Sequence, residues 1–167
     1  MTRLFCDGGV IGRNPSVIGG TWAWCLVEDE RIVHSNSGII LPKEVGLKTV
    51  TNNVTELLAA VMALISMGPL WTGILHTDSF VTLSRLLGHS KFSGVPQWLR
   101  LLTLDLKRNG GKARRWDVSL VAGHPTRKEL ETGVRERNGF PVSPWNVWCD
   151  ERCREEARRV LDSEGRT

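Results

Sequence analysis

The stretch LFCDGGVIGRNP, from Leu4 to Pro15, begins as a β-strand and places a carboxylate, Asp7, directly before two glycines. Asp and Gly are common turn residues, so a strand that ends in a turn is one interpretation. The other is a metal-binding carboxylate at a strand end, with small neighbours that let a substrate approach closely. The stretch alone favours the turn, and the rest of the chain decides between the two.

The length and composition of the chain indicate one globular domain. It has 167 residues, of which 41% are hydrophobic, and a net charge of +4, which is compatible with a polyanionic partner without requiring one. We expect a single domain over residues 1–162 and a short polar tail over 163–167. No apolar run approaches the roughly 18 residues of a membrane span, and no signal peptide is evident. The prediction is a cytoplasmic monomer with no membrane partner.

The cysteines are too few for a disulfide framework, so we expect reduced thiols. They are Cys6, Cys25, Cys149 and Cys153. Cys149 and Cys153 would share one face of a helix and, with His124, suggest zinc ligands. A structural zinc site normally has four ligands in closely spaced pairs, and that pairing is absent. Buried or neutral thiols are therefore favoured over a zinc site.

Hydrophobic periodicity predicts three strands, followed by strands that alternate with helices. The segments TRLFC, GTWAWCLVE and RIVHSNSGIIL are short, rich in aromatic or β-branched residues and separated by turns, which predicts a meander. The next segment, NNVTELLAAVMALISMG, has apolar residues at helical spacing, namely Leu57, Leu58, Val61, Leu64 and Ile65. Then come a strand in GILHTDS, two helices, a strand in WDVSLVAGH and a helix in WCDERCREEARRVLD. This order predicts an α/β fold with a five-stranded mixed sheet flanked by helices.

One long irregular stretch, Pro125 to Asn146, interrupts this pattern. Loops of this length are usually functional or mobile. Thr126 and Glu129 have the spacing of a capping box, which predicts a short helix within the stretch.

Four carboxylates fall at the ends of predicted elements: Asp7, Glu56, Asp78 and Asp150. Turns and helix capping explain each of them separately. If the four ends share one edge of the sheet, however, the acids repel one another unless cations neutralise them. Oxygen-only sites suit Mg²⁺ or Mn²⁺, and two such ions can bind the attacking and leaving oxygens of a phosphodiester displacement.

Five short motifs resemble, in order and spacing, those of type 1 ribonuclease H: CDGG, TNNVTELLAA, HTDS, VAGH and NVWCDERCREEA. The resemblance extends from Leu4 to about Leu161. It implies the ribonuclease H-like fold and a metal-dependent endonuclease that hydrolyses the RNA strand of an RNA–DNA hybrid. It also implies that two Mg²⁺ or Mn²⁺ ions bind, with substrate, at the four acids named above.

The resemblance implies roles for further residues. His124 matches a mobile histidine near the scissile phosphate that helps proton transfer or product release. Gly8, Asn14, Asn52 and Asn53 match positions that contact the hybrid. Amides and main-chain groups there can hydrogen-bond the 2′-hydroxyls that distinguish RNA from DNA. Asn52 and Asn53 also fit a helix cap.

The sequence departs from the family pattern in three places. Phe80 stands where many relatives carry a polar residue that contacts substrate. The short segment GHSKFSG leaves no room for the basic protrusion by which some relatives bind the hybrid. We expect Lys112, Arg114 and Arg115 to contact phosphates in its place, the alternative being an ordinary solvated loop. Finally, His124 and Asp150 lie 26 positions apart, farther than the family pattern leads us to expect.

Two other functions fit the same fold. A DNA nuclease of the resolvase or transposase kind also needs clustered acids and a metal, but it does not need the TNN amides. A catalytically silent hybrid-binding module would be expected to lose at least one of the four acids, and all are present.

Overall fold

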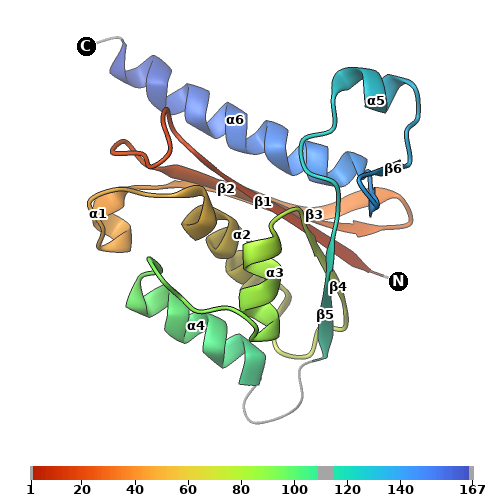
Figure 1. Ribbon diagram of the computed structural model, residues 1–167, viewed down its shortest axis with the longest axis horizontal. Helices are drawn as coiled ribbons and strands as arrows, with labels where there is room; N and C mark the ends of the chain where they lie inside the picture. Colours follow the sequence, from red (N-terminus) through yellow and green to blue (C-terminus); the bar gives the residue numbers. More distant parts are fainter. Residues whose placement is uncertain (1, 109–114, 166–167) are drawn as a thin grey trace.

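The computed structural model describes residues 2–108 and 115–165 and contains a five-stranded mixed sheet (Figure 1). Its strands are β1 (Arg3–Val10), β2 (Gly20–Glu28), β3 (Arg31–Ile40), β4 (Gly73–Thr77) and β5 (Trp116–Leu120). The first three form an antiparallel meander, and β4 and β5 add in parallel to give the order β3-β2-β1-β4-β5. The predicted fold class is confirmed.

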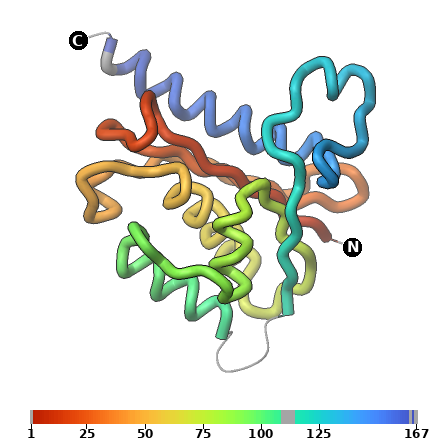
Figure 2. Tube along the Cα trace, viewed as in Figure 1, coloured from red at the N-terminus to blue at the C-terminus, as the bar shows by residue number. Residues whose placement is uncertain are grey.

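Helices cover both faces of the sheet. One face carries α2 (Asn52–Met67), α3 (Phe80–Leu87) and α4 (Gln97–Arg108), and α6 (Pro144–Glu164) runs along the other (Figures 1 and 2). The short helix α1 (Pro42–Val45), which was not predicted, lies between β3 and α2. Within residues 2–108 and 115–165, no helix is both long and apolar enough to cross a bilayer.

The larger core lies between the sheet and α2. Leu57, Leu58, Val61 and Leu64 are buried there, as the helical spacing predicts. Ile65 also belongs to α2, as the spacing predicts, but it is 45% exposed and not part of the buried face. Ile65 is in the last turn of α2 and lies 100° around the helix from Leu64, so it faces away from the sheet.

A second core lies between the sheet and α6 and contains three of the four cysteines, Cys25, Cys149 and Cys153. All four cysteines are free and buried, as predicted. The Cys25 and Cys149 sulfurs are 3.9 Å apart, and the Cys153 thiol donates to the Asp7 carbonyl at 3.5 Å. Burial raises the pKa of Cys149 and of Cys153, so both are neutral thiols that pack α6 against β1 and β2.

The prediction that β1 ends at Asp7 is wrong. The strand continues through both glycines to Val10, and Asp7 pairs with Ala23 of β2. On the other side of β1, the parallel pairing with β4 ends earlier, at Phe5 of β1. The glycines serve packing and not a turn, because a Cβ atom on Gly8 would lie 2.3 Å from the backbone nitrogen of Glu56. Asp7 is therefore inside a strand, at the point where its parallel neighbour has ended.

The C-terminal helix α6 begins earlier than predicted. Ser143 is its N-cap and accepts a hydrogen bond from the Trp145 N–H at 3.3 Å, and Pro144 occupies the first turn. This Ser-Pro pair is a helix-start signal that the sequence analysis missed. Asp150 consequently lies in the second turn of α6 and does not open the helix.

The predicted irregular stretch is largely built of short elements. The capping box of Thr126 and Glu129 is confirmed, and it opens α5 (Arg127–Glu131). A small hairpin follows, made of β6 (Glu136–Arg137) and β7 (Phe140–Pro141). Its turn is Asn138-Gly139, with φ angles of 52° and 80°, and Asn-Gly is a strong hairpin signal that was not used.

Candidate active site

Three of the four predicted acids converge at one edge of the sheet. Asp7, Glu56 and Asp78 each offer a carboxylate oxygen, and these oxygens lie within 4.8 Å of one another. Asp7 comes from β1, Glu56 from the second turn of α2, and Asp78 directly follows β4. Residues far apart in the sequence thus form one acidic group, here called the acidic triad.

Two glycines allow the triad to assemble. Gly8 lets the backbone of α2 approach β1, and this approach brings Glu56 beside Asp7. On the other side, a Cβ atom on Gly123 would lie 3.0 Å from Asp78 Oδ2, so the chain leading to His124 passes close to that carboxylate. The glycines of the CDGG and VAGH motifs therefore act through close packing at the acids.

Burial dominates the electrostatics of the triad. Asp7 is only 3% exposed, and burial, followed by the charges of Asp78 and Asp150, raises its pKa well above the usual range. Burial also raises the pKa of Glu56 and of Asp78, although Ser79 hydrogen-bonds Glu56 and partly offsets the shift there. Each acid is therefore held in a position that disfavours its own charge.

The triad fits a divalent cation. Asp7 Oδ2 is buried without a hydrogen-bond partner, and a buried acceptor without a partner is costly unless something satisfies it. The three grouped ligand atoms are carboxylate oxygens, which are the donors that hard ions such as Mg²⁺ and Mn²⁺ prefer. The donor set excludes the sulfur ligands of a structural zinc site.

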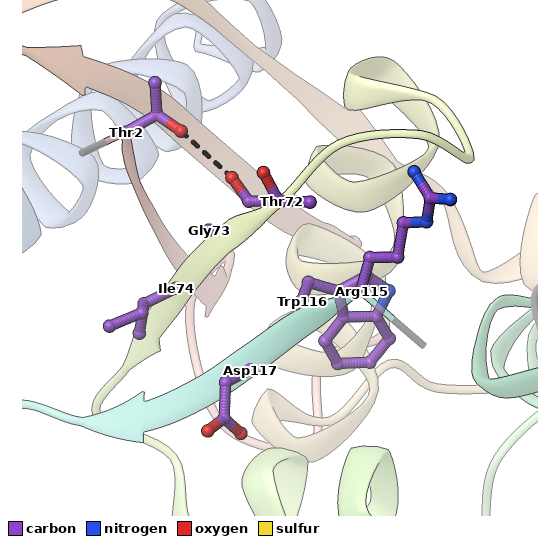
Figure 3. A pocket seen from close by; sticks show the side chains of 7 residues that line it. All are labelled: Thr2, Thr72, Gly73, Ile74, Arg115, Trp116 and Asp117. Atoms are coloured by element: carbon purple, nitrogen blue, oxygen red, sulfur yellow. Dashed lines mark hydrogen bonds between the residues drawn. The ribbon is translucent and has the colours of Figure 1, made fainter. Parts of the chain in front are cut away.

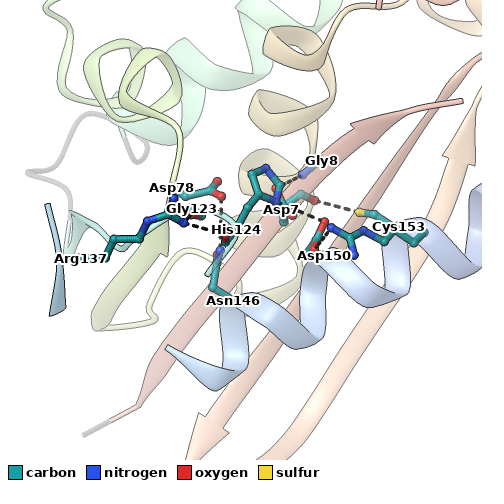
Figure 4. Close-up of polar contacts among 10 residues, drawn as sticks. Asp7, Gly8, Asp78, Gly123, His124, Arg137, Asn146, Asp150 and Cys153 are labelled. Atoms are coloured by element: carbon teal, nitrogen blue, oxygen red, sulfur yellow. Dashed lines mark hydrogen bonds and ion pairs between the residues drawn. The ribbon is translucent and has the colours of Figure 1, made fainter. Parts of the chain in front are cut away.

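The fourth acid, Asp150, is held differently. Its Oδ1 lies 3.6 Å from His124 Nδ1, and its Oδ2 lies 2.8 Å from the guanidinium of Arg154 (Figure 4). Asp150 is thus near the triad and influences the pKa of Asp7, but its carboxylate is not one of the three grouped oxygens. Asp150 therefore has two cationic partners, His124 and Arg154.

The resemblance led us to expect a mobile side chain at His124. In the structure, this side chain is in contact with Asp150. The Asp150 carboxylate beside it raises the pKa of His124 to about 9, so the imidazole is protonated at neutral pH. The side chain remains 66% exposed and lies beside Asp7 and Asp78 of the triad (Figure 4). It can therefore give a proton to an oxygen that leaves near the acids.

Asn146 is a site residue that the sequence analysis missed. It is buried, and its Nδ2 donates to Asp78 Oδ2 at 3.4 Å. Asn146 precedes Asp150 by four positions on α6, so the two side chains share one face of the helix. The sequence analysis missed Asn146 because it predicted that the helix begins at Trp148, which left Asn146 in the preceding loop.

The asparagines of the predicted hybrid contact gather at the start of α2. Asn14 Oδ1 accepts a hydrogen bond from the Asn52 N–H at 3.3 Å, while the N-cap residue Thr51 makes no side-chain cap bond. Asn14 therefore caps the helix, and the alternative interpretation of Asn52 and Asn53 as helix caps does not hold. Asn52 Oδ1 is buried without a partner, and Asn53 is exposed with its carbonyl bound by Arg85 at 3.2 Å.

Arg115, a member of the predicted basic cluster, lies far from the acids. Lys112 and Arg114 lie outside the described residues. Arg115 is exposed and directly precedes β5, whereas Asp78 follows the far end of the parallel strand β4, about 20 Å away at roughly 3.3 Å per residue. Arg115 borders a cavity of about 700 Å³ that contains none of the acids (Figure 3). Phe80, another residue at which the sequence departs from the family pattern, does lie close to the acids: it is two positions after Asp78 and 68% exposed.

Comparisons with known proteins identify the fold. No family model matches the sequence, and no curated protein matches it. Among solved structures, a ribonuclease H1 isolated from compost, in complex with an RNA/DNA hybrid, matches at a TM-score of 0.66 and 16% identity, covering 96% of this chain and 99% of that one. Ribonuclease H1 of the archaeon Halobacterium salinarum matches at 0.64 and 20% identity, covering 95% and 98%.

A third match is the N-terminal ribonuclease H domain of a Mycobacterium tuberculosis protein, solved as a fusion with maltose binding protein. Its TM-score is 0.64 at 15% identity, and the match covers 98% of this chain and 97% of that one. At such identities the likeness is one of fold. The chain therefore has the ribonuclease H-like fold over nearly its full length.

Proposed function

We propose that this protein is a metal-dependent endoribonuclease that hydrolyses the RNA strand of RNA–DNA hybrids. The observation that carries the proposal is the convergence of the acidic triad beside a protonated histidine. An oxygen-only site for hard cations, adjacent to a proton donor, suits phosphodiester hydrolysis. The fold supports the same reaction class, since solved proteins of this fold include ribonucleases H1.

Asp7, Glu56, Asp78 and Asp150 would hold two Mg²⁺ or Mn²⁺ ions together with the substrate. When bound, such ions supply charge neutralisation at the phosphate and activate a water as the nucleophile. Asn146 orients the Asp78 carboxylate through its hydrogen bond. To hold a cation, Asp150 would give up its contact with Arg154, whose side chain is 63% exposed, although Asp150 itself is only 17% exposed.

The role of His124 is that of a general acid or an aid to product release. Its protonated imidazole lies against Asp150 at the open side of the triad. There it can transfer a proton to the leaving 3′ oxygen without occupying a position among the grouped carboxylate oxygens.

Recognition of the RNA strand is assigned to the start of α2. Asn14, Asn52 and Asn53, with the main chain around Gly8, gather about one helical turn before Glu56. Amides and N–H groups at this distance from the acids suit 2′-hydroxyls near the scissile bond. Lys112, Arg114 and Arg115 would contact phosphates farther along the hybrid, which fits the position of Arg115 at the opposite end of β4 and β5.

A cleavage assay across four substrates tests the proposal: an RNA–DNA hybrid, double-stranded RNA, double-stranded DNA and a four-way DNA junction. We expect cleavage of the hybrid alone, in its RNA strand, with Mg²⁺ or Mn²⁺ and not in excess chelator. The matched control is Asp78→Asn, which retains the shape of the side chain. Cleavage of the junction or the DNA duplex in place of the hybrid would contradict the proposal. Hybrid binding without cleavage under either ion would instead support a silent binding module.

A further inference from the structure

One side chain of the long segment between His124 and Asp150 reaches back to the active site. Arg137, on β6, donates from one guanidinium nitrogen to the carbonyl oxygens of Gly123 at 3.1 Å and His124 at 2.8 Å. Figure 4 shows this side chain extended towards both residues. Arg137 touches none of the four acids, so its effect on the site passes through the backbone of His124.

The backbone that Arg137 binds is in a disfavoured conformation. His124 has a φ angle of +45°, in the left-handed region that side-chain-bearing residues seldom adopt. Such a conformation persists only where the surroundings hold it. Gly123, on one side, fits closely against Asp78, and Arg137 binds the carbonyls on the other.

Arg137 is itself fixed by the rest of the segment. Its Nε lies 3.5 Å from Glu129 Oε1, and Glu129 is held in place by its capping box with Thr126, with bonds of 2.5 and 3.2 Å. A planar guanidinium suits this arrangement, since it presents several donors in fixed directions. The hairpin is joined to the end of β5 by a bond of 2.9 Å from the Ala122 N–H to the Pro141 carbonyl.

We propose that Arg137 is a positioning residue for His124. Through the two carbonyls it holds the His124 backbone in the left-handed conformation, and this places the imidazole against Asp150. The unusual length of the 125–143 segment thus acquires a purpose, because α5 and the β6–β7 hairpin together present Arg137 to the site. The inference rests on the proposed function in so far as it assigns His124 a part in turnover.

The kinetic test compares Arg137→Ala with Arg135→Ala, a matched control that removes the same charge from an exposed side chain two residues away. For Arg137→Ala we expect kcat for hybrid cleavage to fall roughly 10-fold or more, as when a supporting partner of a site residue is lost, with KM within about twofold of wild type. Arg137→Lys should recover part of the loss, because an ammonium can still donate to both carbonyls. Arg135→Ala should behave as wild type.

A double-mutant cycle shows whether Arg137 acts through His124. In the His124→Ala background, Arg137→Ala should cause no further loss of kcat, since the group that it positions is gone. Full additivity of the two losses would overturn the proposal. A rise in KM with unchanged kcat would also overturn it, because that pattern indicates a contact with substrate phosphate.

A measurement without turnover keeps the inference separate from the proposed function. The backbone chemical shifts of His124 should show the left-handed conformation in wild type and in Arg135→Ala, and lose it in Arg137→Ala. Retention of that conformation in Arg137→Ala would overturn the proposal even if the enzyme is active. If Arg137→Ala unfolds, Glu129→Gln replaces it, since Gln preserves the capping box and removes only the ion pair. That variant should show the same changes to a smaller degree, and wild-type behaviour in it would count against the proposal.

Discussion

The carboxylates on the two sides of the active site are held by different means. On the α2 side, Asp7, Glu56 and Asp78 are set into packed backbone, and burial raises their pKa values. On the α6 side, Asp150 lies between the cationic side chains of His124 and Arg154, both largely exposed. The triad is therefore a rigidly packed group of carboxylates that can hold a cation, whereas Asp150 already has partners that it can exchange. Packing supplies the geometry of one side, and ion pairing supplies that of the other.

The most severe way to disturb the packed side is to remove one of its charges. Asp7→Asn or Asp78→Asn should lower hybrid cleavage by at least about 10³-fold, the upper range for loss of one preorganised electrostatic group. The metal-free melting temperature should stay the same or rise, since one repelling buried charge is gone. Cleavage assays and thermal melts of each variant measure the two effects. Full activity in both variants would remove these acids from the site.

Loss of the imidazole on the ion-paired side should be less damaging. We expect His124→Ala to reduce turnover by roughly 10², within the usual contribution of a general acid or base. Mg²⁺ or Mn²⁺ affinity, measured by calorimetry, should change little, because the triad does not depend on His124 for its geometry. A collapse of metal affinity would show that His124 supports the metal site instead.

Substitutions at two adjacent glycines, Gly8 and Gly9, test how far the packing of α2 against β1 shapes the triad. Gly8→Ala places a methyl group 2.3 Å from the Glu56 nitrogen, whereas in Gly9→Ala the nearest atom is the Thr21 hydroxyl at 3.0 Å. We expect Gly8→Ala to cost about 1–3 kcal/mol of stability, the usual range for overpacking, and to weaken metal binding by displacing Glu56. Gly9→Ala should cost less and leave metal binding unchanged. Equal effects in denaturant melts of the two variants would argue against this account of α2.

The raised pKa values predict how pH acts on the metal-free protein. A carboxyl group whose folded-state pKa is raised binds more protons in the folded state, so its contribution to stability is lost as pH rises from about 4 through the raised value. The melting temperature of Asp7→Asn relative to wild type should therefore increase from pH 4 to pH 7. Saturating Mg²⁺ should reduce this difference most at pH 7, where the cation competes with the fewest protons. If the melting-temperature difference between metal-free Asp7→Asn and wild type shrinks with rising pH, the pKa of Asp7 is not raised.

The smallest expected effect concerns the arginine that pairs with Asp150. Arg154→Ala frees Oδ2 and removes a competing cation, so Mg²⁺ affinity should increase. The increase should be no more than about fivefold, because an ion pair whose arginine is largely exposed contributes at most about 1 kcal/mol. Arg158→Ala, also exposed on α6, is the control for the loss of charge alone and should leave affinity close to wild type. Weaker metal binding in Arg154→Ala would mean that Arg154 orients Asp150 and does not compete for it.

The sequence by itself determined the order of the main strands and helices and named the acids of the candidate site. These features depend on local patterns. Hydrophobic spacing predicts the meander and α2, and the Thr126 and Glu129 capping box predicts α5 from four adjacent residues. The acidic residues of the site could be named for the same reason, since each belongs to a short motif. Two further local signals, Ser143-Pro144 and Asn138-Gly139, were present in the sequence but not used.

Only the tertiary structure decided how these residues meet. Nothing near Gly8 in the chain indicates that the backbone of Glu56 lies against it, and this contact makes the CDGG motif a strand interior in place of a turn. The bond from Arg137 to the His124 carbonyl likewise joins residues separated by a helix and a turn. Both contacts depend on the packing of elements far apart in sequence, because periodicity and capping report the conformation of a segment and not its neighbours in space.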